Sequence, residues 1–319
     1  MDIVVLGAGA LGTILAAHLA NADHAVSIIA RGRRANQIAN AGLRVNGVSE
    51  IRSREIAVVE PEKASGDLLI VTVKTYDTQA AIAPIRPDRF TSVFSVANGV
   101  AKNEQLAQQF GHQRVLGCMA DTSGELLDAG EVNFTRNICL HLGELNNINS
   151  ARADDVARLI NESGVNAAAR DNIETVEWSK FVGWAALLVL ATSTRASTGN
   201  FLAEPNCAML ASRVIHEMGT IAQAKNIPII DQSPLPVESI TGASIKDGRR
   251  QLQDLGKQWL VNAPGHRLSA LQDIERGKRL EVHETLGFAV EQARQLNIAV
   301  PTLRTCYEMV AGIDGLIGA

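Results

Sequence analysis

A glycine-rich turn near the start of the chain constrains the fold more than any other feature of the sequence. The motif GxGxxG is formed by Gly7, Gly9 and Gly12, directly after the apolar run IVVL and before an Ala/Leu-rich segment. The first glycine permits a tight turn, the second lets a pyrophosphate approach the backbone, and the third lets the helix pack on the strand. A strand, this motif and a helix in succession predict a dinucleotide-binding unit.

The amides of Ala10 and Leu11 complete this predicted site, because a helix N-terminus presents unpaired N–H groups to phosphates. The alternative is that the glycines serve only a tight turn between strand and helix.

The first part of the chain alternates apolar strand patterns with helical patterns. Strands are predicted at 2–6, 25–30, 68–73 and 93–96, with a helix at 10–20. Runs such as IVVLG and LLIVTV are apolar at nearly every position, as expected for strands that are buried on both faces. The pattern predicts an α/β fold, with a doubly wound parallel sheet of the Rossmann type. Two polar-interrupted runs, EVNFT and ICLHLGE, predict an extension of the same sheet over 130–144.

From about residue 174 the pattern becomes helical, which predicts a domain boundary between 1–173 and an all-helical domain at 174–319. The predicted helices are 176–192, 207–225, 269–276, 280–296 and 303–310. Three of the nine prolines fall within 228–236, which predicts a surface loop. The stretch 238–260 has only a weak helical pattern, and no role is assigned to 228–260.

Composition excludes several classes of protein. The chain has 319 residues, 46% of them apolar and 20% charged, with a net charge of −4, which is ordinary for two globular domains. The four cysteines show no metal-ligand spacing, so we expect reduced thiols, no bound metal and a cytoplasmic location. The charge balance gives no argument for a nucleic-acid or membrane partner. The N-terminus lacks the features of a signal peptide, and the longest apolar run, 181–191, is about half a membrane span.

The residue after the second predicted strand indicates which dinucleotide binds. An NAD site expects an acidic residue about 20 positions after the last glycine, where it takes the ribose 2′-hydroxyl. Arg31 holds that place, with Arg33 and Arg34 close behind and no carboxylate beside them. An arginine matches a 2′-phosphate better, so the sequence favours NADPH. We expect Arg33 and Arg34 to be solvated surface charges, and the same alternative stays open for Arg31.

Two further polar residues follow predicted strands. Lys74 ends the run LLIVTVK and Asn98 follows VFSVA. The carboxyl ends of parallel strands form the ligand crevice of such sheets, so both are candidates for contact with a cofactor or substrate. Asn98-Gly99 is also a common turn dipeptide, which is the alternative for that position.

Several segments together resemble the ketopantoate reductase family, the 2-dehydropantoate 2-reductases. They are GAGALG, VTVKTYDT, the tripeptide ANG, EWSK at the start of a helix, LSALQDIERGKRLEVHETLG and NIAVPT. The resemblance covers nearly the whole chain in order. It implies an N-terminal Rossmann domain and a helical C-terminal domain, with reduction of 2-dehydropantoate to pantoate by NADPH in the cleft between them, a step toward pantothenate.

The resemblance also implies roles for individual residues. Lys180 of EWSK is the general acid that protonates the ketone oxygen. Lys74 and Asn98 are cleft residues near cofactor and substrate, Ser269 holds the substrate carboxylate, and Glu281 lies at the cofactor and the cleft.

The chemistry of Lys180 agrees with that role. Hydride addition to a ketone builds negative charge on oxygen, which an ammonium group can both stabilise and protonate. Apolar neighbours such as Trp178 and Phe181 would lower the pKa of a lysine toward the working pH. The alternative is a surface ion pair with Glu177 or Glu174 on the same helix.

Structural alternatives also stay open for the other two residues. Ser269 and Gln272 match a capping box, in which a serine caps the start of a helix. Glu281 can be a charge at a helix start that complements the helix dipole.

The sequence departs from the family pattern beside Lys180. The family has asparagines four and eight positions after this lysine, which lie on its face of the helix. Trp184 and Leu188 occupy those places, and Ala97 replaces the glutamine that usually precedes Asn98. Trp184 and Leu188 line the predicted substrate site and remove polar contacts, so substrate identity is more affected than reaction type.

These patterns lead to one main hypothesis and two rivals. The main hypothesis is an NADPH-dependent reductase of 2-dehydropantoate. One rival is the same chemistry on a more apolar 2-keto acid, and the other is an NADP(H)-sensing module without turnover. Apolar helices in the second domain favour a homodimer, although oligomeric state is not fixed by the sequence.

Overall fold

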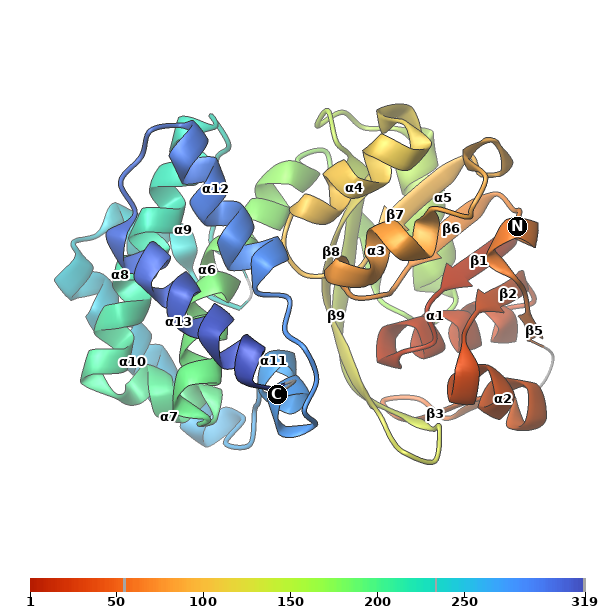
Figure 1. The fold of residues 1–319 in the computed structure, drawn as a ribbon, viewed down its shortest axis with the longest axis horizontal. Coiled ribbons are helices and arrows are strands. Elements are labelled where there is room, and N and C mark those ends of the chain that lie inside the picture. The colour runs from red at the N-terminus through yellow and green to blue at the C-terminus, as the bar shows by residue number, and fades with distance from the viewer. Residues whose placement is uncertain (54–55, 233, 318–319) are drawn as a thin grey trace. The chain divides into compact units, whose positions relative to one another are not determined.

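The computed structural model describes residues 1–53, 56–232 and 234–317. The chain forms two compact units, Met1–Glu174 and Thr175–Ala319. In Figure 1 every arrow belongs to the first unit, and the second is built from helices in green to blue. This is the predicted fold class, an α/β unit followed by a helical one.

A five-stranded parallel sheet forms the centre of the first unit. Its order is β5-β2-β1-β6-β7, as in a Rossmann sheet. From β1 the chain adds strands first on one side and then, from β6, on the other side. The strands are β1 (Asp2–Leu6), β2 (Ala25–Ile29), β5 (Ala57–Val58), β6 (Leu68–Val71) and β7 (Ser92–Ser95). The predicted strands 2–6, 25–30, 68–73 and 93–96 are therefore confirmed, with ends shifted by up to two residues.

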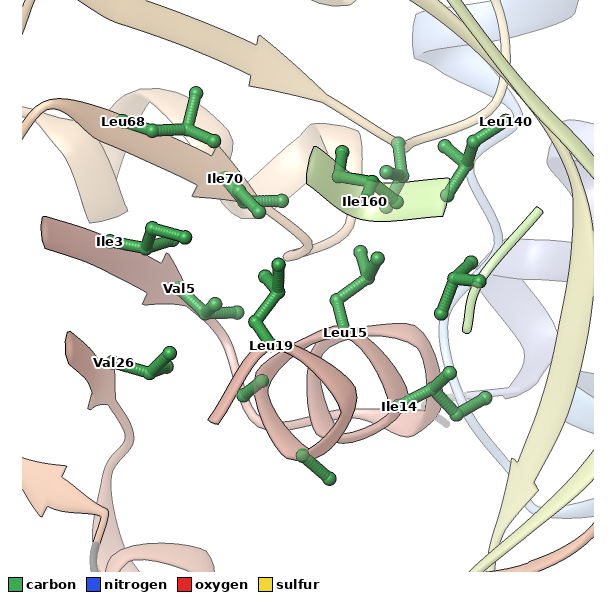
Figure 2. Packing of buried hydrophobic residues seen from close by; sticks show 14 of the residues in the cluster. Ile3, Val5, Ile14, Leu15, Leu19, Val26, Leu68, Ile70, Leu140 and Ile160 are labelled. Carbon is green, nitrogen blue, oxygen red and sulfur yellow. The ribbon is translucent and has the colours of Figure 1, made fainter. Parts of the chain in front are cut away.

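Both faces of this sheet are buried, which explains its continuous apolar strands. Ile3 and Val5 belong to a core with α1 (Ala10–Asn21) and α5 (Ala151–Glu162), whereas Val4 and Leu6 belong to a core on the other face. The second core is completed by residues of α3 (Thr75–Ile82) and α4 (Ala101–Phe110). Figure 2 shows Leu15 pointing from α1 into the first core.

The region 130–144 differs from the expectation. It is one continuous strand, β9 (Val132–Glu144), in a second sheet of order β10-β9-β3-β4, and β8 (Leu116–Leu126) pairs with it antiparallel. The polar break that suggests two strands is explained by Arg136, whose side chain pairs with Asp121 of β8 at 2.6 Å. The other strands of this sheet are β3 (Leu43–Gly47), β4 (Ile51–Ser53) and β10 (Ala167–Ala169). α1 packs against both sheets.

The remaining elements of the first unit are one helix and three short helical turns. They are α2 (Gly32–Ala41), which follows β2, and the 3-10 turns η1 (Pro61–Lys63), η2 (Pro87–Arg89) and η3 (His112–Arg114).

The second unit begins within a long buried helix. The elements are α6 (Ile173–Thr194), α7 (Thr198–Ala203), α8 (Pro205–Ala224), α9 (Val237–Gly242), α10 (Ile245–Asn262), α11 (Ser269–Glu275), the π-helical turn η4 (His283–Gly287), α12 (Phe288–Gln295) and α13 (Pro301–Ile317). The long predicted helices are present. The predicted helix 280–296 starts instead with η4, and α10 shows that the weak pattern at 238–260 is largely helical.

The proline-rich segment 228–236 is more closely packed than a surface loop. The Ile230 amide donates a hydrogen bond to Ser179 Oγ of α6 at 2.9 Å, and Leu235 is buried. Gln232 donates to the Val176 carbonyl. The segment therefore covers one face of α6.

Three further observations concern the described residues alone. None of their helices is long and apolar enough to span a lipid bilayer. Within the same residues no three His, Cys, Asp or Glu side chains gather in a way that could hold a metal ion. The four cysteines are free thiols.

Candidate active site

The order of the parallel sheet places the predicted dinucleotide residues along one edge. The carboxyl ends of β2, β1, β6 and β7 are neighbours, and they lead in turn to Arg31, the glycine-rich turn, Lys74 and Asn98. The switch in strand order falls between β1 and β6, where ligands bind in open sheets of this type. The four features therefore lie side by side at the edge of the sheet where a ligand is expected to bind.

Each glycine of the turn meets a different steric demand. Gly7 has φ +104°, and a Cβ atom there would lie 2.9 Å from Thr72 Oγ1. A Cβ atom on Gly12 would lie only 2.1 Å from the Gly7 carbonyl oxygen. Around Gly9, in contrast, a Cβ atom would meet no atom within 4 Å. The space at Gly9 is thus open, as a backbone that admits a phosphate requires.

Thr72 fixes this turn from the end of β6. Its hydroxyl lies 2.8 Å from the Gly7 carbonyl and 3.1 Å from the Leu6 carbonyl, to which it donates. The hydroxyl fills the space that Gly7 and Gly12 leave by lacking Cβ atoms. Thr72 cannot be recognised as a site residue from the sequence, because a threonine at the end of a strand carries no special signal.

The start of α1 is suited to an anion. Gly9 is its N-cap and offers no side-chain cap, and no acidic residue lies in the first turn. The first amides, including those of Ala10 and Leu11, therefore keep their dipole directed at the open space beside Gly9. The residues present fit the phosphates of a dinucleotide.

The arginines after β2 differ in their surroundings. Arg31 is exposed and forms the N-cap of α2, and its guanidinium makes no hydrogen bond or ion pair with a described residue. Arg33 is exposed and donates to the Asp128 carbonyl at 2.5 Å. The expectation of a solvated charge is wrong for Arg34, which is half-buried and donates four hydrogen bonds.

Lys74 and Asn98 are both half-buried at the ends of their strands. Lys74 is the N-cap of α3, and its carbonyl accepts from the Asp77 amide at 2.9 Å. Asn98 precedes a turn residue, Gly99, with φ +77°, so the turn conformation that the dipeptide suggests is present. Lys102, only 2% exposed, donates from Nζ to the Gly99 carbonyl at 2.8 Å and holds this turn.

Lys180 lies in the middle of α6 and is half-buried, unlike most of that helix. Its aromatic neighbours Trp178 and Phe181 are buried and pack edge to face, with ring centroids 5.7 Å apart. Trp184 is 6% exposed and Leu188 is 1% exposed. The face of α6 that carries Lys180 is therefore apolar on the C-terminal side of the lysine.

The two candidate residues of the LSALQDIERGKRLE segment differ from each other in burial. Ser269 is exposed and is the first residue of α11, whereas the N-cap is Leu268, without a side-chain cap. The capping-box interpretation is therefore wrong. Glu281 is 6% exposed and precedes η4 by two residues, next to the N-cap residue Val282.

Comparison with known proteins assigns the family. The model described as ketopantoate reductase PanE/ApbA matches residues 3–147, and the model of the C-terminal part of the same family matches residues 172–314. The chain belongs to the ketopantoate reductase family. Membership confirms the predicted enzyme class, an oxidoreductase of this family, and together with the glycine-rich turn it indicates a nicotinamide cofactor.

Individual relatives match over nearly their full length. A 2-dehydropantoate 2-reductase of Archaeoglobus fulgidus is 28% identical over 98% of this chain and 97% of its own. The solved structure of a PanE/ApbA family ketopantoate reductase from Ralstonia eutropha JMP134 is 24% identical, with a TM-score of 0.84 and all of both chains covered. A D-mandelate dehydrogenase, solved with NADH and anilino(oxo)acetate, is 18% identical with a TM-score of 0.85 and the same coverage. The two structures support the fold.

Proposed function

We propose that the chain reduces 2-dehydropantoate to pantoate with NADPH. The observation that carries the proposal is the family match, which spans both units in order. It is supported by a glycine-rich turn whose geometry admits a phosphate at Gly9.

The preference for NADPH rests on Arg31. It is exposed at the carboxyl end of β2, beside the glycine-rich turn, and its guanidinium has no partner among the described residues. A guanidinium binds a phosphate through two parallel hydrogen bonds, whereas it offers no selective acceptor for a 2′-hydroxyl. Lys74, on the other side of the turn, is the second cation proposed at the cofactor.

Lys180 is the proposed general acid. A bound nicotinamide supplies the hydride that reduces the ketone carbon. The Lys180 ammonium donates a hydrogen bond to the ketone oxygen as negative charge develops there, and then gives it the proton. The buried aromatic rings of Trp178 and Phe181 exclude water from the helix around it.

The other proposed contacts follow from the family resemblance. Ser269 is exposed, so its hydroxyl is accessible to a substrate carboxylate. Asn98 contacts cofactor and substrate from a turn held by Lys102. Glu281 is proposed at the cofactor, with a carboxylate that is largely withdrawn from solvent.

A second candidate substrate class is a more apolar 2-keto acid. Trp184 and Leu188 favour it, because an indole and an isobutyl group provide no hydrogen bond to a substrate hydroxyl. The two candidates share cofactor, proton donor and reaction type, and differ only in the groups beyond the keto acid.

A substrate screen tests the proposal. NADPH oxidation is followed at 340 nm with 2-dehydropantoate, 2-ketoisovalerate and other small 2-keto acids. We expect turnover of 2-dehydropantoate. Turnover of apolar keto acids alone would favour the second candidate, and NADPH binding without any turnover would favour a sensor. We further propose a homodimer in the cytoplasm, for which sedimentation velocity tests the dimer and cell fractionation the location.

A further inference from the structure

Arg34 is a half-buried cation that holds the glycine-rich turn from the side of α2. Its Nε donates to the carbonyl of Ala8, between Gly7 and Gly9, at 2.9 Å. Its Nη2 donates to Thr13 Oγ1 in the first turn of α1 at 2.8 Å. One guanidinium thus binds both the residue after the first glycine and the start of the helix, and it holds them in a fixed geometry.

The same guanidinium reaches the loop between β8 and β9. Its Nη1 donates to the Gly130 carbonyl at 2.7 Å and to Gln37 Oε1 at 3.4 Å. Gly130 has φ +88°, and a Cβ atom there would lie 2.9 Å from this nitrogen. The backbone conformation at 130 therefore favours glycine, and a Cβ atom there would displace the end of the arginine side chain.

The charge of Arg34 has no counter-ion among the described residues. All four of its hydrogen-bond acceptors are neutral. Burial, followed by the positive charge of Arg44, lowers the pKa of the guanidinium. Charged side chains that lose solvent are normally paired. A guanidinium has five N–H groups and four are used, which leaves one Nη2 hydrogen for a ligand.

We propose that Arg34 is a positioning residue of the dinucleotide site, which fixes the Ala8 peptide of the glycine-rich turn and supplies a positive charge whose counter-ion is a phosphate of the bound dinucleotide. The proposal deepens the proposed function and rests on it only for the identity of the ligand. It predicts an effect on the part that NADPH and NADH share, the pyrophosphate, whereas Arg31 acts on the 2′-phosphate alone.

Dissociation constants of NADPH and NADH, measured by calorimetry, test the proposal. For Arg34→Gln we expect both to rise by about 10-fold or more, because charge-assisted hydrogen bonds are the strong ones. Arg34→Lys keeps the charge but loses the several N–H donors of the guanidinium, so it should bind both cofactors more tightly than Arg34→Gln and less tightly than the unaltered protein. Arg33→Ala is the matched control, an exposed arginine one position away, and should change neither constant.

A second variant keeps the test decisive if Arg34→Gln fails to fold. Gly130→Ala retains Arg34 but displaces its Nη1, and it should also weaken the binding of both cofactors. The proposal is overturned if folded Arg34→Gln binds both cofactors as the unaltered protein does, if only NADPH is weakened, or if Arg33→Ala has the same effect. These constants need no substrate, so failure of keto-acid reduction would contradict the proposed function and leave this proposal standing.

Discussion

Two alanine substitutions in the glycine-rich turn separate its steric role from its ligand-binding role. At Gly12 the added Cβ would lie 2.1 Å from the Gly7 carbonyl oxygen and 2.4 Å from Thr72 Oγ1. The first of these atoms is backbone, so the turn or α1 must move. At Gly9 the added Cβ meets nothing within 4 Å, and φ of −71° is one that alanine adopts readily.

The expected magnitudes differ accordingly. Overpacking costs about 1–3 kcal/mol, and each kcal/mol lowers the Tm of a domain of this size by about 2–4 °C. Gly12→Ala should therefore lose several degrees and bind cofactor poorly. Gly9→Ala loses a favourable N-cap but gains from a less flexible unfolded chain, two effects of about 0.5–1 kcal/mol that oppose each other. Its Tm should stay close to that of the unaltered protein.

The affinity of Gly9→Ala decides between the two roles. A methyl group in the open space should keep the phosphate from the amides of α1 and raise the NADPH dissociation constant by about 10- to 100-fold. Calorimetry gives the affinity and differential scanning fluorimetry gives the Tm. If Gly9→Ala binds NADPH as tightly as the unaltered protein, no phosphate approaches Gly9, and the assignment of this turn is refuted.

Three further variants test the proposed site. Arg31→Ala should lower the affinity for NADPH by about 10- to 100-fold and the affinity for NADH little, as measured by direct binding. Equal affinities of the unaltered protein for both cofactors would contradict the role of Arg31. Lys180→Ala should lower kcat by about 10²–10⁴-fold with NADPH affinity retained, and loss of Tm alone would make the lysine structural. The double variant Trp184→Asn, Leu188→Asn should raise the ratio of kcat/KM for 2-dehydropantoate to that for 2-ketoisovalerate. If an amide at the buried position 188 unfolds the chain, Trp184→Asn alone serves for the test. A ratio already above about 10³ in the unaltered protein would show that other groups bind the hydroxyl.

Local constraints explain which parts of the fold the sequence could predict. The strand, turn and helix around Gly7 are recoverable because two demands on the glycines are local: Gly7 has φ +104°, and a Cβ atom on Gly12 would lie 2.1 Å from the Gly7 carbonyl oxygen. The sequence does not show that 130–144 belongs to a separate sheet, because β9 pairs there with the distant strand β3, where Val45 lies beside Val132. Arg136 looks like a break until its ion pair with Asp121 of β8 is known.

The same distinction applies to the candidate site. Arg31 can be found from its spacing to the glycines, whereas Arg34 appears as one more surface arginine, because Gly130 lies far away in the sequence. The capping box at Ser269 failed because Leu268 takes the N-cap position. A four-residue pattern does not fix where a helix starts to within one residue.

Deuterium transfer tests the central claim most directly. The protein is incubated with 2-dehydropantoate and NADPH that carries deuterium at both positions of nicotinamide C4, and the pantoate formed is analysed by mass spectrometry and NMR. Direct hydride transfer predicts one deuterium at C2 of pantoate in every product molecule. Pantoate without the label, or no pantoate from folded protein that binds NADPH, would contradict the account.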